Sequence, residues 1–157
     1  MSLVEEYQEA RRGEDLARLR RVLALRALIA DGLSQRAIAE QLGVSQSAIS
    51  QQLRSAPDLS RQDPVSLLEA GAPIVKALAA DRGFTRLAVF GSVARGDARP
   101  DSDIDLLIEA PKGTSSFEFV RLQQLIEQVL GRQVDLVSYG GLKPGLDDDI
   151  RREAVSL

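Results

Sequence analysis

The 157-residue sequence contains no cysteine and no histidine. The absence of cysteine excludes disulfides and thiolate metal sites, and the absence of histidine removes the commonest metal ligand and general base. Any metal chemistry must therefore use oxygen ligands, which suit Mg²⁺ or Mn²⁺. No apolar run approaches the roughly 20 residues that span a bilayer, and the acidic first residues lack the apolar segment of a signal peptide. We expect a cytoplasmic protein.

The hydrophobic content of 44% is sufficient for a buried core, and the net charge of −3 conceals an uneven distribution. From Arg11 to Arg54 there are eight arginines against four acidic residues, whereas residues 62–157 carry 11 basic and 15 acidic residues. This asymmetry indicates that the two halves of the chain have different partners.

The basic half begins with the pattern of a long amphipathic helix over residues 15–30. Two shorter helices follow, with Ser34 and Ser45 at the expected N-cap positions and Gly43 in the turn between them. We expect four apolar residues to fill the space between these helices: Ile38, Leu42, Val44 and Ile49. Residues 34–53 resemble the DNA-binding helix-turn-helix of bacterial and phage repressors.

The second of these helices would present short polar groups and amides to a major groove. The residues on this outward face are Gln46, Ser47, Ser50, Gln51 and Arg54. Because a lone helix-turn-helix usually reads a half-site, DNA binding implies a homodimer. The alternative is a helical hairpin that binds no DNA.

A linker is predicted at residues 57–64, which contain two prolines and no apolar period. It separates a helical domain at residues 1–56 from a second domain at residues 65–157. A helix begins at the last linker residue, Pro64, continues into the second domain and is kinked or interrupted at Pro73. Strands are predicted at residues 85–90, 104–109 and 133–138. Helices are predicted at residues 117–130, with Phe117 and Val120 among those available to pack, and at residues 146–154. Strands separated by helices predict an α/β or α+β fold.

The strongest functional signal lies between the first two strands. Gly91 allows a sharp turn, and Ser92 with nearby backbone N–H groups is able to bind phosphate. Asp103 and Asp105 point to one face of an extended strand and repel each other unless a cation lies between them. Asp135, a charged residue in a short strand that we expect to be buried, is the candidate third carboxylate.

Residues 91–106 resemble the signature of the polymerase-β-like nucleotidyltransferases: Gly-Ser, then Ala-Arg-Gly, then Ser-Asp-Ile-Asp-Leu after five residues. The small second domain points to the minimal nucleotidyltransferase branch, and hence to a small mixed sheet. The resemblance implies that Gly91 and Ser92 bind the triphosphate of ATP or another nucleotide. It also implies that three aspartates ligate magnesium and carry the catalysis: Asp103, Asp105 and Asp135. Arg95 and Ser102 match motif positions, where they either contact the nucleotide or support the local turns.

The same resemblance implies transfer of a nucleoside monophosphate, with release of pyrophosphate, to a hydroxyl acceptor. Minimal members resemble antitoxins whose partner is a HEPN-type toxin and which transfer AMP to a tyrosine of that toxin. A fused helix-turn-helix fits an antitoxin that also represses its own operon. Two alternatives remain: a transcription regulator whose second domain only senses nucleotide, and a small-molecule enzyme of the aminoglycoside-modifying type.

Overall fold

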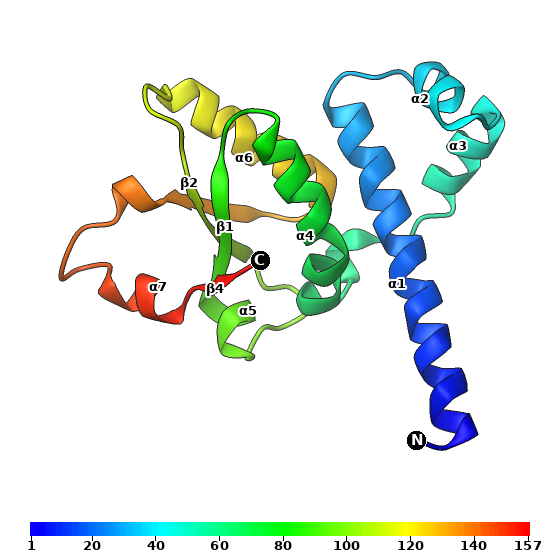
Figure 1. The fold of residues 1–157 in the computed structure, drawn as a ribbon, viewed down its shortest axis with the longest axis horizontal. Helices are drawn as coiled ribbons and strands as arrows, with labels where there is room; N and C mark the ends of the chain where they lie inside the picture. The colour runs from blue at the N-terminus through cyan, green and yellow to red at the C-terminus, as the bar shows by residue number, and fades with distance from the viewer.

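The computed structural model describes residues 1–157 as one four-stranded sheet with its own helices, and a group of helices beside it (Figure 1). Three helices form the first part of the chain: α1 (Leu3–Ala30), α2 (Gln35–Leu42) and α3 (Gln46–Arg54). A short 3-10 helix, η1 (Leu59–Arg61), follows them. The remaining elements are α4 (Pro64–Ala80), β1 (Thr85–Phe90), α5 (Gly91–Arg95), β2 (Ile104–Glu109), α6 (Ser116–Leu130), β3 (Val134–Ser138), the 3-10 helix η2 (Tyr139–Gly141), α7 (Asp148–Glu153) and β4 (Val155–Ser156).

The sheet has the strand order β3-β2-β1-β4 and is mixed. β2 pairs with β3 in parallel, and β1 pairs with β2 and β4 antiparallel. Helices α4 and α6 cover one face, where their apolar side chains form the main core with alternate strand residues such as Val89, Ile104 and Leu106. The other face carries a smaller cluster that includes Phe90 and Leu107. The structure confirms the predicted class, a helical first part followed by an α/β unit with a small mixed sheet.

Helix α1 is longer than the sequence pattern indicated, because it begins at Leu3 and not near Asp15. Its start is stabilised by a capping box, in which the Ser2 side chain accepts from the N–H of Glu5 and the Glu5 carboxylate accepts from the N–H of Ser2. Leu19 and Leu23 of α1 are buried in the main core with residues of α4 and α6. The first part of the chain thus supplies side chains to the core of the second.

The predicted helix-turn-helix caps are present. Ser34 and Ser45 accept from backbone N–H groups, and Gly43 ends α2 in the left-handed conformation at φ 68°. The predicted packing is confirmed for Ile38 and Ile49, which are fully buried. It is wrong for Leu42 and Val44, which are 55% and 43% exposed. Helix α1 explains the difference, since its Leu25 completes the small core with Ile38, Ala39 and Ile49.

Four predictions in the second part need correction. Phe117 and Val120 are 79% and 50% exposed, because the packed face of α6 follows Phe119, Leu122 and Leu125 and Phe119 packs near Phe84. Helix α4 continues through Pro73 without interruption. The last helix is only six residues long.

Strand β4, which was not predicted, adds a two-residue edge beside β1. No helix has the length and apolar character needed to cross a membrane.

Candidate active site

The parallel pairing of β2 with β3 places Asp105 directly opposite Asp135. Neighbouring strands lie about 4.8 Å apart, so residues in register with the same orientation hold their side chains next to each other on one face. This face is opposite to the one that α4 and α6 cover, because the adjacent residues Ile104 and Leu106 point into the main core. Asp103 precedes the strand by one residue and is exposed. The chain fold therefore brings together Asp105 and Asp135, which are far apart in sequence, with Asp103 beside them.

Asp135 differs from the expectation in one respect. Strand β3 is an edge strand, and Asp135 is exposed whereas its neighbours Val134 and Leu136 are buried. Its charge is therefore solvated, so burial does not explain why an acidic residue occupies this position of the strand. The cross-strand partner Asp105 supplies the physical reason to consider it part of a site.

The pKa of Asp105 is raised, and the causes describe the site. Burial contributes most, followed by the negative charges of Asp135 and Asp103, while Arg95 opposes the shift and Glu153 adds to it slightly. Mutual repulsion among carboxylates is the condition that a bound cation relieves. Glu153 was missed in the sequence because nothing in its local pattern places α7 next to β2.

Gly91 holds the turn between β1 and α5 against Asp105. Its φ is +72°, and a Cβ added there would lie 1.9 Å from Oδ2 of Asp105. Only glycine fits here, because a side chain at this position would overlap the Asp105 carboxylate. A residue other than glycine would also be strained at this φ. Helix α5 begins at Gly91, and half-buried Ser92 lies in its first turn.

Arg95 and Ser102 are engaged in contacts within the chain. The Arg95 guanidinium donates to Glu153 at 2.7 Å and forms an ion pair with Asp97 at 3.4 Å, which raises the pKa of Arg95. The contact with Glu153 links α5 to α7. The Ser102 hydroxyl accepts from the N–H of Arg99 at 2.8 Å and so shapes the turn before Asp103. Turn support is thus visible for both residues, and nucleotide contact stays a prediction.

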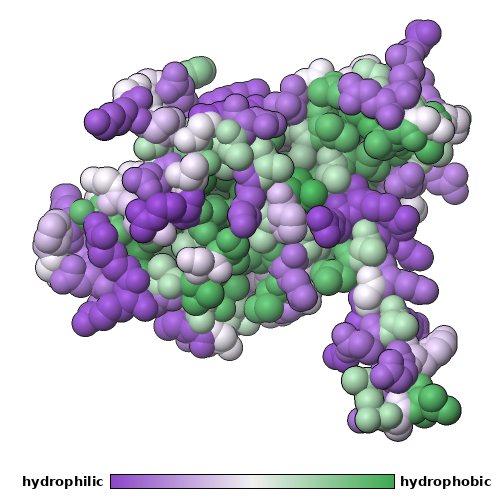
Figure 2. Space-filling view, in the orientation of Figure 1, coloured by the Kyte–Doolittle hydropathy of each residue, from purple (hydrophilic) through white to green (hydrophobic).

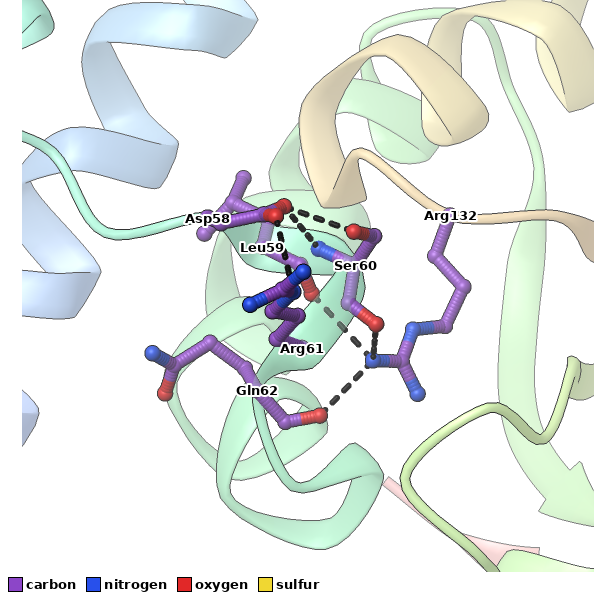
Figure 3. Close-up of polar contacts among 6 residues, drawn as sticks. All are labelled: Asp58, Leu59, Ser60, Arg61, Gln62 and Arg132. Carbon is purple, nitrogen blue, oxygen red and sulfur yellow. Dashed lines mark hydrogen bonds and ion pairs between the residues drawn. The ribbon is translucent and has the colours of Figure 1, made fainter.

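Arg132 anchors the segment between the two parts of the chain (Figure 3). Its Nη2 donates to the carbonyls of Ser60 at 2.9 Å and Gln62 at 2.7 Å, with Leu59 at 3.2 Å. Its Nη1 donates to the carbonyl of Ser102 at 3.2 Å. One guanidinium therefore ties the predicted linker to the residue before Asp103, a role that the sequence pattern did not indicate.

The carboxylates lie at an open surface. Asp103 and Asp135 are exposed, and a hollow of about 710 Å³ lies elsewhere, between α1 and the segment that leads into α4. As placed, no group of three or more acidic side chains is arranged to hold a metal ion. The donors nevertheless fit a hard divalent cation in kind, because they are carboxylate oxygens in register on adjacent strands.

The predicted DNA-reading residues share one side of α3. Gln46, Ser47, Gln51 and Arg54 are exposed. Ser50 is half-buried and accepts from Arg54 Nη1 at 2.8 Å. Their spacing of one, three and four residues places all five within one helical face.

Comparison with known proteins gives two family matches. Residues 73–157 match the model described as a nucleotidyltransferase domain, and residues 17–58 match sigma-70, region 4. The second match agrees with a helix-turn-helix-like region in the first part of the chain. The first match covers the whole candidate site.

Individual relatives carry similar descriptions. A "Putative protein adenylyltransferase MJ0435" of Methanocaldococcus jannaschii is 43% identical over 75 residues, which are 48% of this chain and 81% of the relative. The "Protein adenylyltransferase MntA" of Thermococcus cleftensis is 40% identical over 73 residues, which are 46% of this chain and 74% of the relative. A solved "Structure of putative minimal nucleotidyltransferase" has a TM-score of 0.56 and 43% identity, covering 61% of this chain and 98% of that chain.

Proposed function

The chain belongs to the nucleotidyltransferase domain family, and we propose that it transfers AMP from ATP to a hydroxyl group of a partner protein. The observation that carries this proposal is the pairing of Asp105 with Asp135 in register, with the Gly91 backbone against Asp105. A turn able to accept phosphate thus meets paired carboxylates at one point of the sheet.

The proposed roles follow from the chemistry of each group. Asp103, Asp105 and Asp135 would hold Mg²⁺ or Mn²⁺, which when bound supplies positive charge to the triphosphate and to the acceptor oxygen. Gly91 and Ser92 would position the triphosphate through the backbone and hydroxyl of the first turn of α5. Arg95 and Ser102 would keep this turn and the Asp103 segment in place, through the contacts to Glu153 and Arg99.

A protein acceptor fits the surface better than a small molecule. Small-molecule sites are usually concave and bury most of their ligand. Asp103 and Asp135 are instead exposed, and the hollow of about 710 Å³ beside α1 lies away from them. We therefore propose that the partner completes the acceptor site, and that a tyrosine of a HEPN-type toxin is the acceptor, with this chain as its antitoxin.

The first part of the chain is proposed to bind operator DNA as a homodimer. Its support is the match to sigma-70 region 4 and the polar outer face of α3, which carries Gln51 and Arg54. Autoregulation would combine this activity with the transferase in one chain. The functional division at residues 57–64 is part of this proposal.

Transfer to protein is tested with ATP labelled on the α-phosphate, Mg²⁺ and a protein that co-purifies with the chain. We expect label and the added mass of AMP on the partner, lost in Asp103→Asn but retained in Asp101→Asn, an exposed aspartate in the preceding turn. Label on an aminoglycoside alone would establish the small-molecule reaction. Nucleotide binding without transfer to the co-purifying partner would establish a sensor.

DNA binding is tested by a salt-dependent shift of the upstream operator. Gln51→Ala and Arg54→Ala are expected to weaken binding, and loss of a phosphate contact at Arg54 should lower the salt slope by about 1. Gln52→Ala is the control, because Gln52 is also exposed but lies on the opposite side of α3. Unchanged affinity and slope in both test variants would refute the assigned face.

A further inference from the structure

The first half of α1 extends from the body of the protein without cover from the rest of the chain (Figure 1). Every residue from Leu3 to Asp15 is exposed. The free end is nonetheless apolar in part: Leu3, Val4 and Tyr7 are 88%, 66% and 70% exposed, and Figure 2 shows hydrophobic residues at this tip. Isolated helices of about 12 residues are marginal in water, so a partner that covers this segment would stabilise it.

A heptad stripe runs along α1 on a side that the rest of the chain leaves largely uncovered from Leu3 to Arg21. Its positions alternate by four and three residues: Leu3, Tyr7, Ala10, Glu14, Ala17, Arg21, Ala24 and Leu28. The residues of α1 in the main core, Leu19 and Leu23, lie on a different side. Ala17 and Arg21 are exposed and Ala24 is half-buried, so the stripe remains accessible where α1 crosses the body. Leu28, at the end of the stripe, is half-buried because one side of it packs against the helix-turn-helix core. This spacing is that of a two-helix contact.

Charge is segregated between the two halves of α1. Residues 3–15 contain five acidic residues and two arginines, whereas residues 16–30 contain four arginines and no acidic residue. Two parallel copies of the helix would place like charges together. Two antiparallel copies would place the acidic half of each beside the basic half of the other, which is favourable.

We propose that a second copy of the chain packs antiparallel along α1. One register pairs every stripe position with an opposite stripe position: Leu3 with Leu28, Tyr7 with Ala24, Ala10 with Arg21, and Glu14 with Ala17. The large Tyr7 ring then meets a small residue, as close helix packing requires. Glu14 comes within about one helical turn, ~6 Å along the axis, of Arg21 in the second copy. This inference rests on the proposed homodimer and assigns its surface.

The arrangement also suits paired DNA half-sites. With the axis between residues 15 and 16 and a rise of 1.5 Å per residue, the two Ala30 ends lie about 43 Å apart. This separation is of the same order as the roughly 34–36 Å between half-sites one helical turn apart. Each copy of α3 follows its own α1 end, so the two reading helices belong to opposite ends of the pair.

Engineered cysteines test the register, and no native cysteine interferes with the cross-linking because the chain has none. The double variant Tyr7→Cys with Ala24→Cys should form a covalent dimer on oxidation. Within one chain these positions are about 25 Å apart along the helix, too far for a disulfide. Neither single variant should cross-link, since position 7 faces position 24 of the second copy. Cross-linking of Tyr7→Cys alone would indicate parallel helices and overturn the proposal.

Measuring the mass in solution tests the proposed α1 surface separately from the existence of the homodimer. We expect light scattering to give a dimer for the native chain, a monomer for Tyr7→Asp, and a dimer for the control Phe117→Asp, another exposed aromatic position. A dimer that Tyr7→Asp leaves intact would overturn this surface and leave the homodimer standing. A native monomer would overturn both. Label transfer to the partner, measured on the same variants, reports the transferase proposal independently.

Discussion

Replacement of Gly91 by alanine tests whether the turn after β1 must contact Asp105. The added Cβ would lie 1.9 Å from Oδ2 and 2.8 Å from Cγ of Asp105, whereas ordinary contacts are 3.4–4 Å. Restoring contact distance moves the carboxylate oxygen by about 1.5 Å, the difference between 3.4 and 1.9 Å. The alternative is a shift of the turn itself. Either movement separates the proposed phosphate-binding turn from the carboxylate beside it.

The expected magnitudes follow from strain and from displacement. Alanine at a left-handed φ costs about 1–2 kcal/mol, and each kcal/mol lowers the melting temperature of a chain of this size by roughly 2–4 °C. A displacement of about 1 Å in a positioned catalytic group costs on the order of 100-fold in rate. Gly91→Ala should therefore lose about two orders of magnitude in kcat/KM for label transfer while it remains folded at 25 °C.

Gly96→Ala is the matched control. Gly96 also has a left-handed φ, +81°, but a Cβ there meets nothing within 4 Å. Both variants carry backbone strain, so urea unfolding should show a similar loss from strain in each, with the clash adding to the loss in Gly91→Ala. Only Gly91→Ala should lose transfer. Equal kcat/KM in the two variants would refute the inference that close approach to Asp105 requires glycine at this position.

Three further outcomes are expected. Burial and neighbouring carboxylates raise the pKa of Asp105, so the folded protein keeps this proton to a higher pH than the unfolded chain does. The free energy of unfolding therefore falls as the pH rises from about 4 through the raised pKa. Asp105→Asn should therefore resist urea better than wild type at neutral pH, with an advantage that shrinks toward pH 4; a constant or opposite difference would contradict the shift. Mg²⁺ should raise the melting temperature of wild type but not of Asp105→Asn, and an equal rise in both would exclude Asp105 as a ligand. Arg132→Ala leaves the carbonyls of Ser60, Gln62 and Ser102 without this donor, which should lower the free energy of unfolding in urea by about 2–4 kcal/mol. Arg132→Lys should recover little of this loss, because an ammonium group lacks the planar fork of a guanidinium.

Local signals in the sequence predicted the local structure well. Ser34 and Ser45 cap helices because a hydroxyl satisfies a free N–H at a helix start, and Gly43 ends a helix because it tolerates positive φ. The strands at residues 85–90 and 104–109 have the predicted ends, since apolar content and flanking turns define them. Features that depend only on residues close together in the sequence can thus be predicted from the sequence alone.

Tertiary contacts could not be predicted from the sequence. Leu42 and Val44 looked like core residues, and they are exposed because Leu25 of α1 covers Ile38 and Ile49 instead. The start of α1 was missed because residues 3–14 bury nothing, although the Ser2–Glu5 capping box was a readable signal. Asp135 was expected to be a site residue because its strand was thought to be buried, but Asp135 is exposed. The register of β3 beside β2 places it next to Asp105. Glu153 and Arg132 have no sequence pattern that reveals their contacts.

Helix α1 makes the two parts of the chain one mechanical unit. Leu23 lies in the main core and Leu25 in the helix-turn-helix core, two residues apart on one continuous helix. Arg132 adds a second link, from the segment after α3 to the carbonyl of Ser102 beside Asp103. Since a helix without an internal proline or inserted group bends only gently, the position of α1 determines the positions of both sites together. A second copy docked on α1 would therefore fix two copies of α3 and two candidate transferase sites in one geometry.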